Sequence, residues 1–240
     1  MEKEIFKENL IKELSAKNVE FSAEQIDKIY LYMNMLLEWN EKINLTAITE
    51  PKEIITKHFV DSLTASEYIK EESKVIDCGT GAGFPGIPLA IYRPDAEFVL
   101  IDSLNKRVNF LNEVIEKLGL KNVTAIHTRA EDLAYEKEYR EQFDYAVSRA
   151  VANMSTLLEY LLPFCKVGGE AICMKGANIE EELNNSKKAL EVLNGKIEKV
   201  DNFTLPFTDY VRNIIIVKKV AQISNKYPRR QGKPAKEPIQ

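Results

Sequence analysis

Residues 75–90 have the sequence VIDCGTGAGFPGIPLA, in which a short apolar run is followed by four closely spaced glycines. The apolar run predicts a buried strand that ends at Asp77, and the segment after the glycines predicts a helix. Glycine tolerates positive φ and lets a ligand approach the backbone closely. A tight turn that binds nothing needs fewer glycines, so we expect Gly79, Gly81 and Gly83 to belong to a binding site.

Acidic residues around this loop distinguish between two classes of ligand. The segment GAGFPG at residues 81–86 formally matches the GxGxxG of dinucleotide-binding turns. Asp77 argues against that ligand, because a carboxylate at the strand end repels a pyrophosphate but suits the sulfonium and ammonium of S-adenosylmethionine. Asp102 ends the next predicted strand, where a carboxylate accepts hydrogen bonds from ribose hydroxyls or caps the following helix. These residues favour S-adenosylmethionine and leave a nicotinamide-dependent oxidoreductase as the alternative.

Strands and helices alternate beyond this segment. The predicted strands are KVIDC (74–78), EFVLID (97–102), NVTAIH (122–127), FDYAVS (143–148) and EAICMK (170–175), and the spacing of Leu104, Val108, Leu111, Ile115 and Leu118 predicts a helix. Such alternation is typical of a mostly parallel sheet, because parallel strands need a crossover connection. Runs at 196–203 and 211–218 are expected to pair antiparallel at a sheet edge. The predicted fold is therefore α/β, with a mostly parallel seven-stranded sheet.

Residues 1–70 are predicted to form a helical extension ahead of the sheet domain at 71–220. Ser22 and Gln25 have the spacing of a capping box at a helix start. The apolar residues that follow lie at helical spacing: Ile26, Ile29, Tyr30, Met33, Leu36 and Leu37. We expect Trp39, near the end of this helix, to be a core residue.

Residues 221–240 are predicted to form a basic strap. The segment NKYPRRQGKPAKEPIQ (225–240) contains three prolines and a glycine, which predict an extended course. The whole chain has a formal net charge of −4, so any contact with nucleic acid requires a local basic patch. Arg229, Arg230, Lys233 and Lys236 supply one, and the alternative is a solvated tail.

The composition excludes several classes of protein. With 45% hydrophobic and 29% charged residues, the chain is neither disordered nor fibrous. Three cysteines without a CxxC and two histidines give no zinc-site spacing, so we expect no metal. The N-terminus lacks a signal peptide, and no apolar run approaches the roughly 20 residues that cross a bilayer. We expect a cytoplasmic monomer without membrane contact.

Several segments together resemble the bacterial GidB/RsmG family. They are NEKINLTAI (40–48), KHFVDSL (57–63), DCGTGAGFPGIPLA (77–90), DSLNKRVNFL (102–111), RAEDLA (129–134), SRAVA (148–152), MKG (174–176) and KYPRRQGKPAKEPI (226–239). Members are class I S-adenosylmethionine-dependent methyltransferases with a Rossmann-like fold. The resemblance implies methyl transfer to N7 of a guanine in the decoding-region loop of 16S ribosomal RNA, with 16S RNA or the small ribosomal subunit as partner.

The resemblance also implies which residues form the site. Those implied for the cofactor are Asp77, Gly79, Gly81, Gly83, Phe84, Asp102, Ser103, Leu104, Ala130, Glu131 and Arg149. Those considered for positioning the substrate are Arg149, Lys175, His58 and Asn44, and Lys175 joins the strap residues as an RNA contact. For His58 the alternative is a packed or capping histidine, and for Asn44 it is a turn cap. We assign no general base, because guanine N7 carries a free lone pair.

Two other functions are open. One keeps the methyltransferase fold with a different substrate, and the other keeps RNA as the partner without catalysis. A small-molecule or protein methyltransferase uses the same scaffold, because this fold does not dictate the substrate. A non-enzymatic RNA-binding module is the other, although such a module has no use for two carboxylates around a glycine loop.

Overall fold

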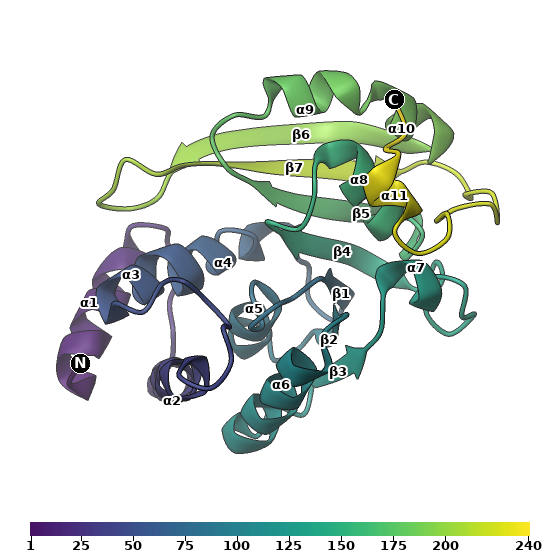
Figure 1. The fold of residues 1–240 in the computed structure, drawn as a ribbon. Coiled ribbons are helices and arrows are strands. Elements are labelled where there is room, and N and C mark those ends of the chain that lie inside the picture. Colours follow the sequence, from purple (N-terminus) through teal and green to yellow (C-terminus); the bar gives the residue numbers. More distant parts are fainter.

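The computed structural model describes residues 1–240 and is built on one seven-stranded sheet, in the order β3-β2-β1-β4-β5-β7-β6 (Figure 1). The strands are β1 (Lys74–Cys78), β2 (Glu97–Asp102), β3 (Val123–His127), β4 (Phe143–Arg149), β5 (Cys165–Lys175), β6 (Gly195–Thr204) and β7 (Val211–Lys219). Strands β1 to β5 pair in parallel, and β7 runs antiparallel to both β5 and β6. The predicted seven-stranded sheet is confirmed, and of its antiparallel pair β6 is the edge strand, because β7 lies between it and β5.

Helices cover both faces of this sheet (Figure 1). They are α1 (Lys3–Ser15), α2 (Ala23–Asn40), α3 (Pro51–Ile54), the π-helical η1 (Ile55–Val60), α4 (Asp61–Leu63), the 3₁₀ turn η2 (Ser66–Tyr68), α5 (Gly86–Tyr92), α6 (Asn105–Leu118), α7 (Ala130–Leu133), α8 (Met154–Leu161), α9 (Glu180–Asn185), α10 (Lys187–Val192) and α11 (Lys233–Lys236). Helices α1 to α6 pack on one face and α7, α8 and α10 on the other. No helix is both long and apolar enough to cross a membrane.

Side chains of the strands alternate between the two hydrophobic cores, one on each face of the sheet. Val147 and Ile172 belong to the core beneath α1 to α6, whereas their neighbours Ala146 and Cys173 belong to the core beneath α8. Successive side chains of a strand point to opposite faces, so a short apolar run fills two cores at once. This is why the strand segments are nearly continuous apolar runs.

The N-terminal helices share the core of the sheet. The capping box of Ser22 and Gln25 is present at the start of α2, as predicted. The buried side chains of α2 include Tyr32, while Tyr30 and Leu37 are only half-buried. Trp39 is half-buried against Phe110, with ring centroids 5.6 Å apart. Residues 1–70 thus pack on the sheet instead of forming a core of their own.

The helix predicted from Leu104 begins one residue later than expected. Helix α6 starts at Asn105, and Leu104 is its N-cap residue with 52% of its surface exposed. Its buried face consists of Val108, Phe110, Leu111, Val114 and Leu118. The prediction that Leu104 belongs to the buried stripe was therefore wrong, because this residue precedes the first turn of α6.

Residues 221–240 are held against the sheet domain along their length. The Arg140 guanidinium donates to the Tyr227 carbonyl at 3.0 Å, and the Thr156 hydroxyl donates to the Pro234 carbonyl at 2.9 Å. Helix α11 interrupts the extended course that the prolines predicted, and Pro234 is buried in it. The segment is a docked strap, not a free tail.

Candidate active site

Two adjoining cavities open at the carboxyl ends of the parallel strands. The first cavity, of about 360 Å³, lies over the ends of β1, β2 and β3. The second cavity, of about 660 Å³, lies over the ends of β4 and β5 and the start of β7. Residues 150–152, just after β4, line both cavities, so the two cavities adjoin at this segment. Ligands of open α/β sheets bind at this edge, so the pair is the candidate site.

At two of its glycines, the loop after β1 is packed too tightly for a side chain. A Cβ added to Gly79, which has φ +72°, would lie 2.7 Å from Val151 Cγ2. At Gly83, with φ +100°, it would lie 2.6 Å from the Tyr32 hydroxyl. That hydroxyl donates to the Ala82 carbonyl, so α2 fixes the loop from below. Tyr32 is a supporting residue that the sequence analysis missed, because the predicted helical stripe included Tyr30 and left Tyr32 out.

Asp77 lies beneath the loop and does not line either cavity. Its Oδ2 accepts hydrogen bonds from the Thr80 hydroxyl at 2.7 Å and from the Gly86 N–H at 2.9 Å. Its Oδ1 is buried without a partner. Burial is the main cause that raises the pKa of this carboxyl to about 7, and the two hydrogen bonds oppose the rise. The side chain anchors the loop to the start of α5, and one oxygen stays free.

Asp102 joins the loops that follow β1 and β2. Its Oδ2 accepts from the Gly81 N–H at 3.0 Å and its Oδ1 from the Leu104 N–H at 2.8 Å. Arg107 approaches the same carboxylate at 3.4 Å. Asp102 is buried at the floor of the first cavity, which Arg107 also lines. This carboxylate therefore holds together two loops that line the cavity.

The strap completes the wall of the first cavity. The buried Glu131 accepts a hydrogen bond from the Gly232 N–H at 2.9 Å. Ala235 lines the same cavity together with Ala130 and Tyr160. Part of the wall thus comes from residues about a hundred positions apart in the chain, which the sequence analysis did not anticipate.

The structure brings together only some of the residues predicted for the cofactor. Gly79, Asp102, Ser103, Ala130 and Glu131 line the first cavity. Arg149 lines the second cavity instead. Those that line neither cavity are Asp77, Gly81, Gly83, Phe84 and Leu104, and all but Leu104 lie in or under the glycine loop.

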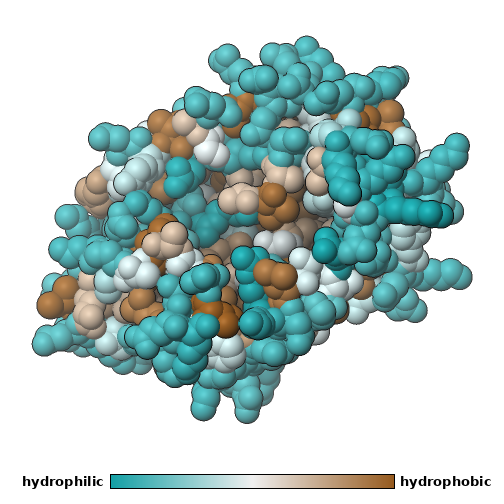
Figure 2. Space-filling model, in the orientation of Figure 1, coloured by the Kyte–Doolittle hydropathy of each residue, from teal (hydrophilic) through white to brown (hydrophobic).

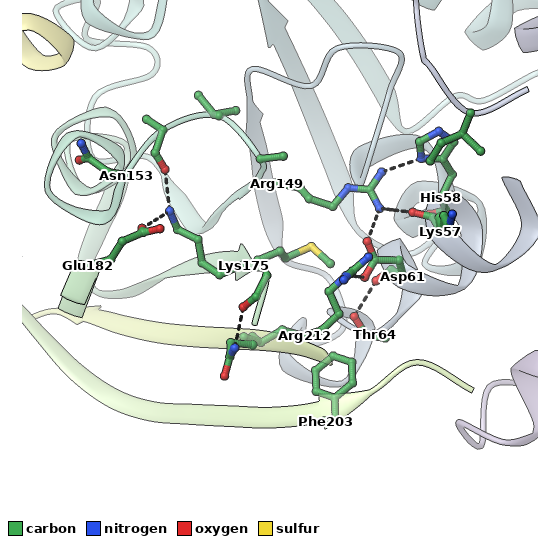
Figure 3. Close-up of a pocket in the computed structure, with 18 residues that line it drawn as sticks. Lys57, His58, Asp61, Thr64, Arg149, Asn153, Lys175, Glu182, Phe203 and Arg212 are labelled. Carbon is green, nitrogen blue, oxygen red and sulfur yellow. Dashed lines mark hydrogen bonds and ion pairs between the residues drawn. The ribbon is translucent and has the colours of Figure 1, made fainter. Parts of the chain in front are cut away.

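Two groups of charged residues stand on opposite sides of the second cavity (Figure 3). On one side, Asp61 binds Arg149 at 2.7 Å and Arg212 at 3.0 Å. On the other, the Lys175 ammonium binds Glu182 and the Ala152 carbonyl, each at 2.6 Å. With Lys57 also in the wall, cations outnumber anions. The cavity thus favours an anionic ligand.

His58 is a neutral member of this wall. An arginine only donates, so the contact of 3.3 Å from Arg149 to Nδ1 leaves the proton on Nε2, which lies 2.8 Å from the Thr46 hydroxyl. The ring stacks on Phe84 with centroids 4.4 Å apart. Burial, followed by the charge of Arg149, lowers the pKa of His58 to about 3. This imidazole is therefore uncharged and held in place at neutral pH.

Of the residues considered for the substrate, His58, Arg149 and Lys175 line the second cavity, and Asn44 does not. Asn44 is exposed on the loop that carries Thr46. The sequence analysis missed Asp61 and Arg212 at this site. Asp61 lies within the quoted KHFVDSL, but nothing in its spacing marks it as the partner of two arginines.

The basic strap residues differ from one another in exposure. Arg229 forms a paired contact with the fully buried Glu159, with Nη2 to Oε2 at 2.7 Å and Nε to Oε1 at 2.9 Å. Arg230, Lys233 and Lys236 are exposed, and Lys233 lies 3.6 Å from Glu237. Arg229 thus has a buried partner within the protein, and its contact with a phosphate stays a prediction.

The face of the molecule that contains the second cavity is mostly hydrophilic (Figure 2). Hydrophobic residues gather around a hollow near its centre, over the region between α4 and the ends of β4 and β5 (Figures 1 and 2). Apolar side chains of the second cavity include Ile48, Val151, Met174 and Phe203. A flat apolar group with an anionic attachment suits such a site. No cluster of three or more metal-binding side chains is present.

Comparison with solved structures shows the fold. A SAM-dependent methyltransferase from Aquifex aeolicus superimposes with a TM-score of 0.53 at 19% identity, covering 75% of this chain and 97% of that one. The TYW2 protein of M. jannaschii, solved in complex with AdoMet, gives a TM-score of 0.52 at 19% identity, covering 66% and 74%. The fold is that of class I S-adenosylmethionine-dependent methyltransferases.

Comparison of sequences shows the family. A protein of Acetivibrio thermocellus named ribosomal RNA small subunit methyltransferase G is 53% identical over 231 residues, 96% of this chain and 95% of that one. Its namesake from Alkaliphilus metalliredigens is 52% identical over 217 residues, 90% and 91% of the two chains. The family model GidB, rRNA small subunit methyltransferase G, matches residues 25–214. The chain belongs to this family of ribosomal RNA methyltransferases.

Proposed function

We propose that this protein transfers the methyl group of S-adenosylmethionine to N7 of one guanine in the decoding-region loop of 16S ribosomal RNA. The family supplies the reaction and the substrate class. The observation that carries the proposal is the pair of cavities that share residues 150–152. A cofactor in the first cavity and a base in the second would meet at that shared wall.

The residues of the first cavity fit the cofactor. Its volume of about 360 Å³ suits a nucleoside-sized ligand. Asp102 and Glu131 offer carboxylates for hydroxyl and amine groups, and the unpartnered Oδ1 of Asp77 supplies negative charge below the loop. Gly79, Ser103 and Ala130 would hold the rest of the molecule. When bound, S-adenosylmethionine supplies a methyl group on a positively charged sulfur.

The second cavity suits a guanine nucleotide. Guanine N7 attacks through its own lone pair, so the reaction needs orientation more than a base, and the neutral, hydrogen-bonded His58 is not needed as one. Arg149, Arg212 and Lys57 would bind phosphate, and Phe203 and Met174 would contact the ring. The target base has to leave its stack to enter, which is easiest from a loop.

The first experiment incubates the protein with methyl-labelled S-adenosylmethionine and small ribosomal subunits from cells that lack the enzyme. We expect label in 7-methylguanosine at a single position after digestion of the RNA to nucleosides. Free 16S RNA in parallel shows which form is the substrate. Tight cofactor binding without label in RNA would instead favour another acceptor on the same scaffold.

We further propose that the protein acts as a monomer. Ribosomal RNA is modified where subunits are assembled, so we further propose that the enzyme acts in the cytoplasm. Sedimentation at assay concentrations tests the first point, and fractionation of cells tests the second.

Asp61→Asn is expected to lower kcat/KM for the RNA substrate by about 30-fold, because it removes the charge that pairs two arginines at the second cavity. The dissociation constant for S-adenosylmethionine should stay within twofold, since Asp61 lies outside the first cavity. Steady-state kinetics and calorimetry measure the two quantities. Glu191→Gln, at an exposed pair, is the control. An equal loss of cofactor affinity would show that Asp61 supports the structure of both cavities and has no specific role in the second one.

A further inference from the structure

The connection between β6 and β7 carries two exposed aromatic side chains beside the second cavity. Phe207 is 67% exposed, the largest fraction of any exposed large hydrophobic residue, and Tyr210 is 42% exposed. The hairpin reaches past the rest of the sheet toward α1 and α3 (Figure 1). A single exposed hydrophobic residue is common at a protein surface, but here two aromatic rings stand together with cations over them.

The backbone holds Phe207 outward in a fixed turn. The Leu205 N–H donates to the Tyr210 carbonyl at 3.0 Å, and the Tyr210 N–H donates to the Thr208 hydroxyl at 3.1 Å. Leu205 is buried and anchors the turn. Phe207 itself has φ +58°, a conformation that costs a bulky residue free energy. The turn that closes the hairpin therefore presents this ring to solvent in a fixed position.

Cations lie over both rings. The Lys12 ammonium is 4.6 Å from the centroid of Phe207, and the Lys57 ammonium is 4.7 Å from that of Tyr210. Lys57, in η1, also pairs with Glu53 in α3. The Arg212 guanidinium lies 5.9 Å from the centroid of Tyr210. Lys57 and Arg212 line the second cavity, so the aromatic and basic surface is continuous with it.

We infer that Lys12, Lys57, Phe207 and Tyr210, here called the hairpin platform, bind single-stranded RNA next to the target nucleotide. This inference rests on the proposed function. Aromatic rings stack on any base, and lysines beside them bind the phosphates between bases. A nucleotide flipped into the second cavity leaves its neighbours unstacked at the mouth, where the platform begins. The platform would hold them there.

The test compares Phe207→Ala with Phe207→Tyr in methylation of small ribosomal subunits. We expect Phe207→Ala to raise KM for subunits about tenfold, because a base–aromatic stack is lost, and Phe207→Tyr to restore it. The kcat, the dissociation constant for S-adenosylmethionine and the melting temperature should stay unchanged. Val167→Ala, at an exposed residue near the opposite end of β5, is the control.

Two results would overturn the platform while leaving the proposed function intact. One is an unchanged KM for Phe207→Ala when the wild-type protein methylates guanine. The other is a dimer of the wild-type protein that Phe207→Ala dissociates, since a second copy would then cover the ring. Failure of the wild-type protein to methylate ribosomal RNA would overturn both proposals, so the three outcomes are distinguishable.

Discussion

Arg229→Ala is expected to lower the free energy of unfolding by about 2–3 kcal/mol, whereas Arg230→Ala leaves it unchanged. Glu159 is fully buried and receives three donors from Arg229, including the backbone N–H at 2.6 Å. Removing the guanidinium leaves a carboxylate in the core without its countercharge. Urea unfolding measures the difference, and we expect the melting temperature to fall by about 5–10 °C.

The same change is expected to weaken cofactor binding. The strap that Arg229 fastens also brings Gly232 to Glu131 and places Ala235 in the wall of the first cavity. Adding Glu159→Gln to Arg229→Ala should recover part of the stability, because the buried group is then neutral. If Arg229→Ala weakened RNA binding alone, with stability and cofactor affinity intact, the guanidinium would be the phosphate contact that the sequence suggested.

Local patterns in the sequence were sufficient to predict the strands of the sheet. They also predicted that the last two strands pair antiparallel at its edge. An apolar strand, a helical spacing and a glycine-rich loop can each be recognised from residues that are close together in the chain. The role of Arg229 depends on Glu159, which lies 70 positions earlier and is buried on α8. A cluster of basic residues in sequence cannot show which member has a buried partner.

The site shows the same division between local and distant information. Asp102, which ends a predicted strand, lines the first cavity together with Ser103 and Ala130, which the family resemblance implied. The group of Asp61, Arg149 and Arg212 joins α4, β4 and β7 across separations of 88 and 151 positions. Its members were visible in the sequence only as separate charges, because the ion pairs form when the helical extension packs on the sheet.

Asp77→Ala is expected to weaken the binding of S-adenosylmethionine by at least about 100-fold. The substitution removes the acceptor for both Thr80 and Gly86 and releases the loop from α5. Asp77→Asn keeps an oxygen for those two donors and removes only the charge. We expect it to bind about tenfold more weakly than the wild-type protein, because the ligand is a cation. Calorimetric titration measures all three proteins.

The pH dependence distinguishes anchoring from charge at Asp77. Its pKa is raised by burial from 3.8 to about 7, so the group favours folding below pH 4 and loses that contribution as the pH rises through about 7. A cationic ligand favours the ionised carboxylate, and affinity should therefore increase as the pH rises through about 7. Binding at pH 6.5 should release a proton, which titration in buffers of different ionisation enthalpy detects.

Asp77→Asn is expected to abolish both the proton release and the rise in affinity with pH. Asp27→Asn, at an exposed side chain on α2, is the control and should leave both in place. If Asp77→Asn bound the cofactor as tightly as the wild-type protein at every pH, the carboxylate would act only as an anchor for Gly86 and Thr80. The free Oδ1 would then have no part in recognising the positive charge of the cofactor, and that charge would have to be balanced by Asp102 or Glu131 at the cavity wall.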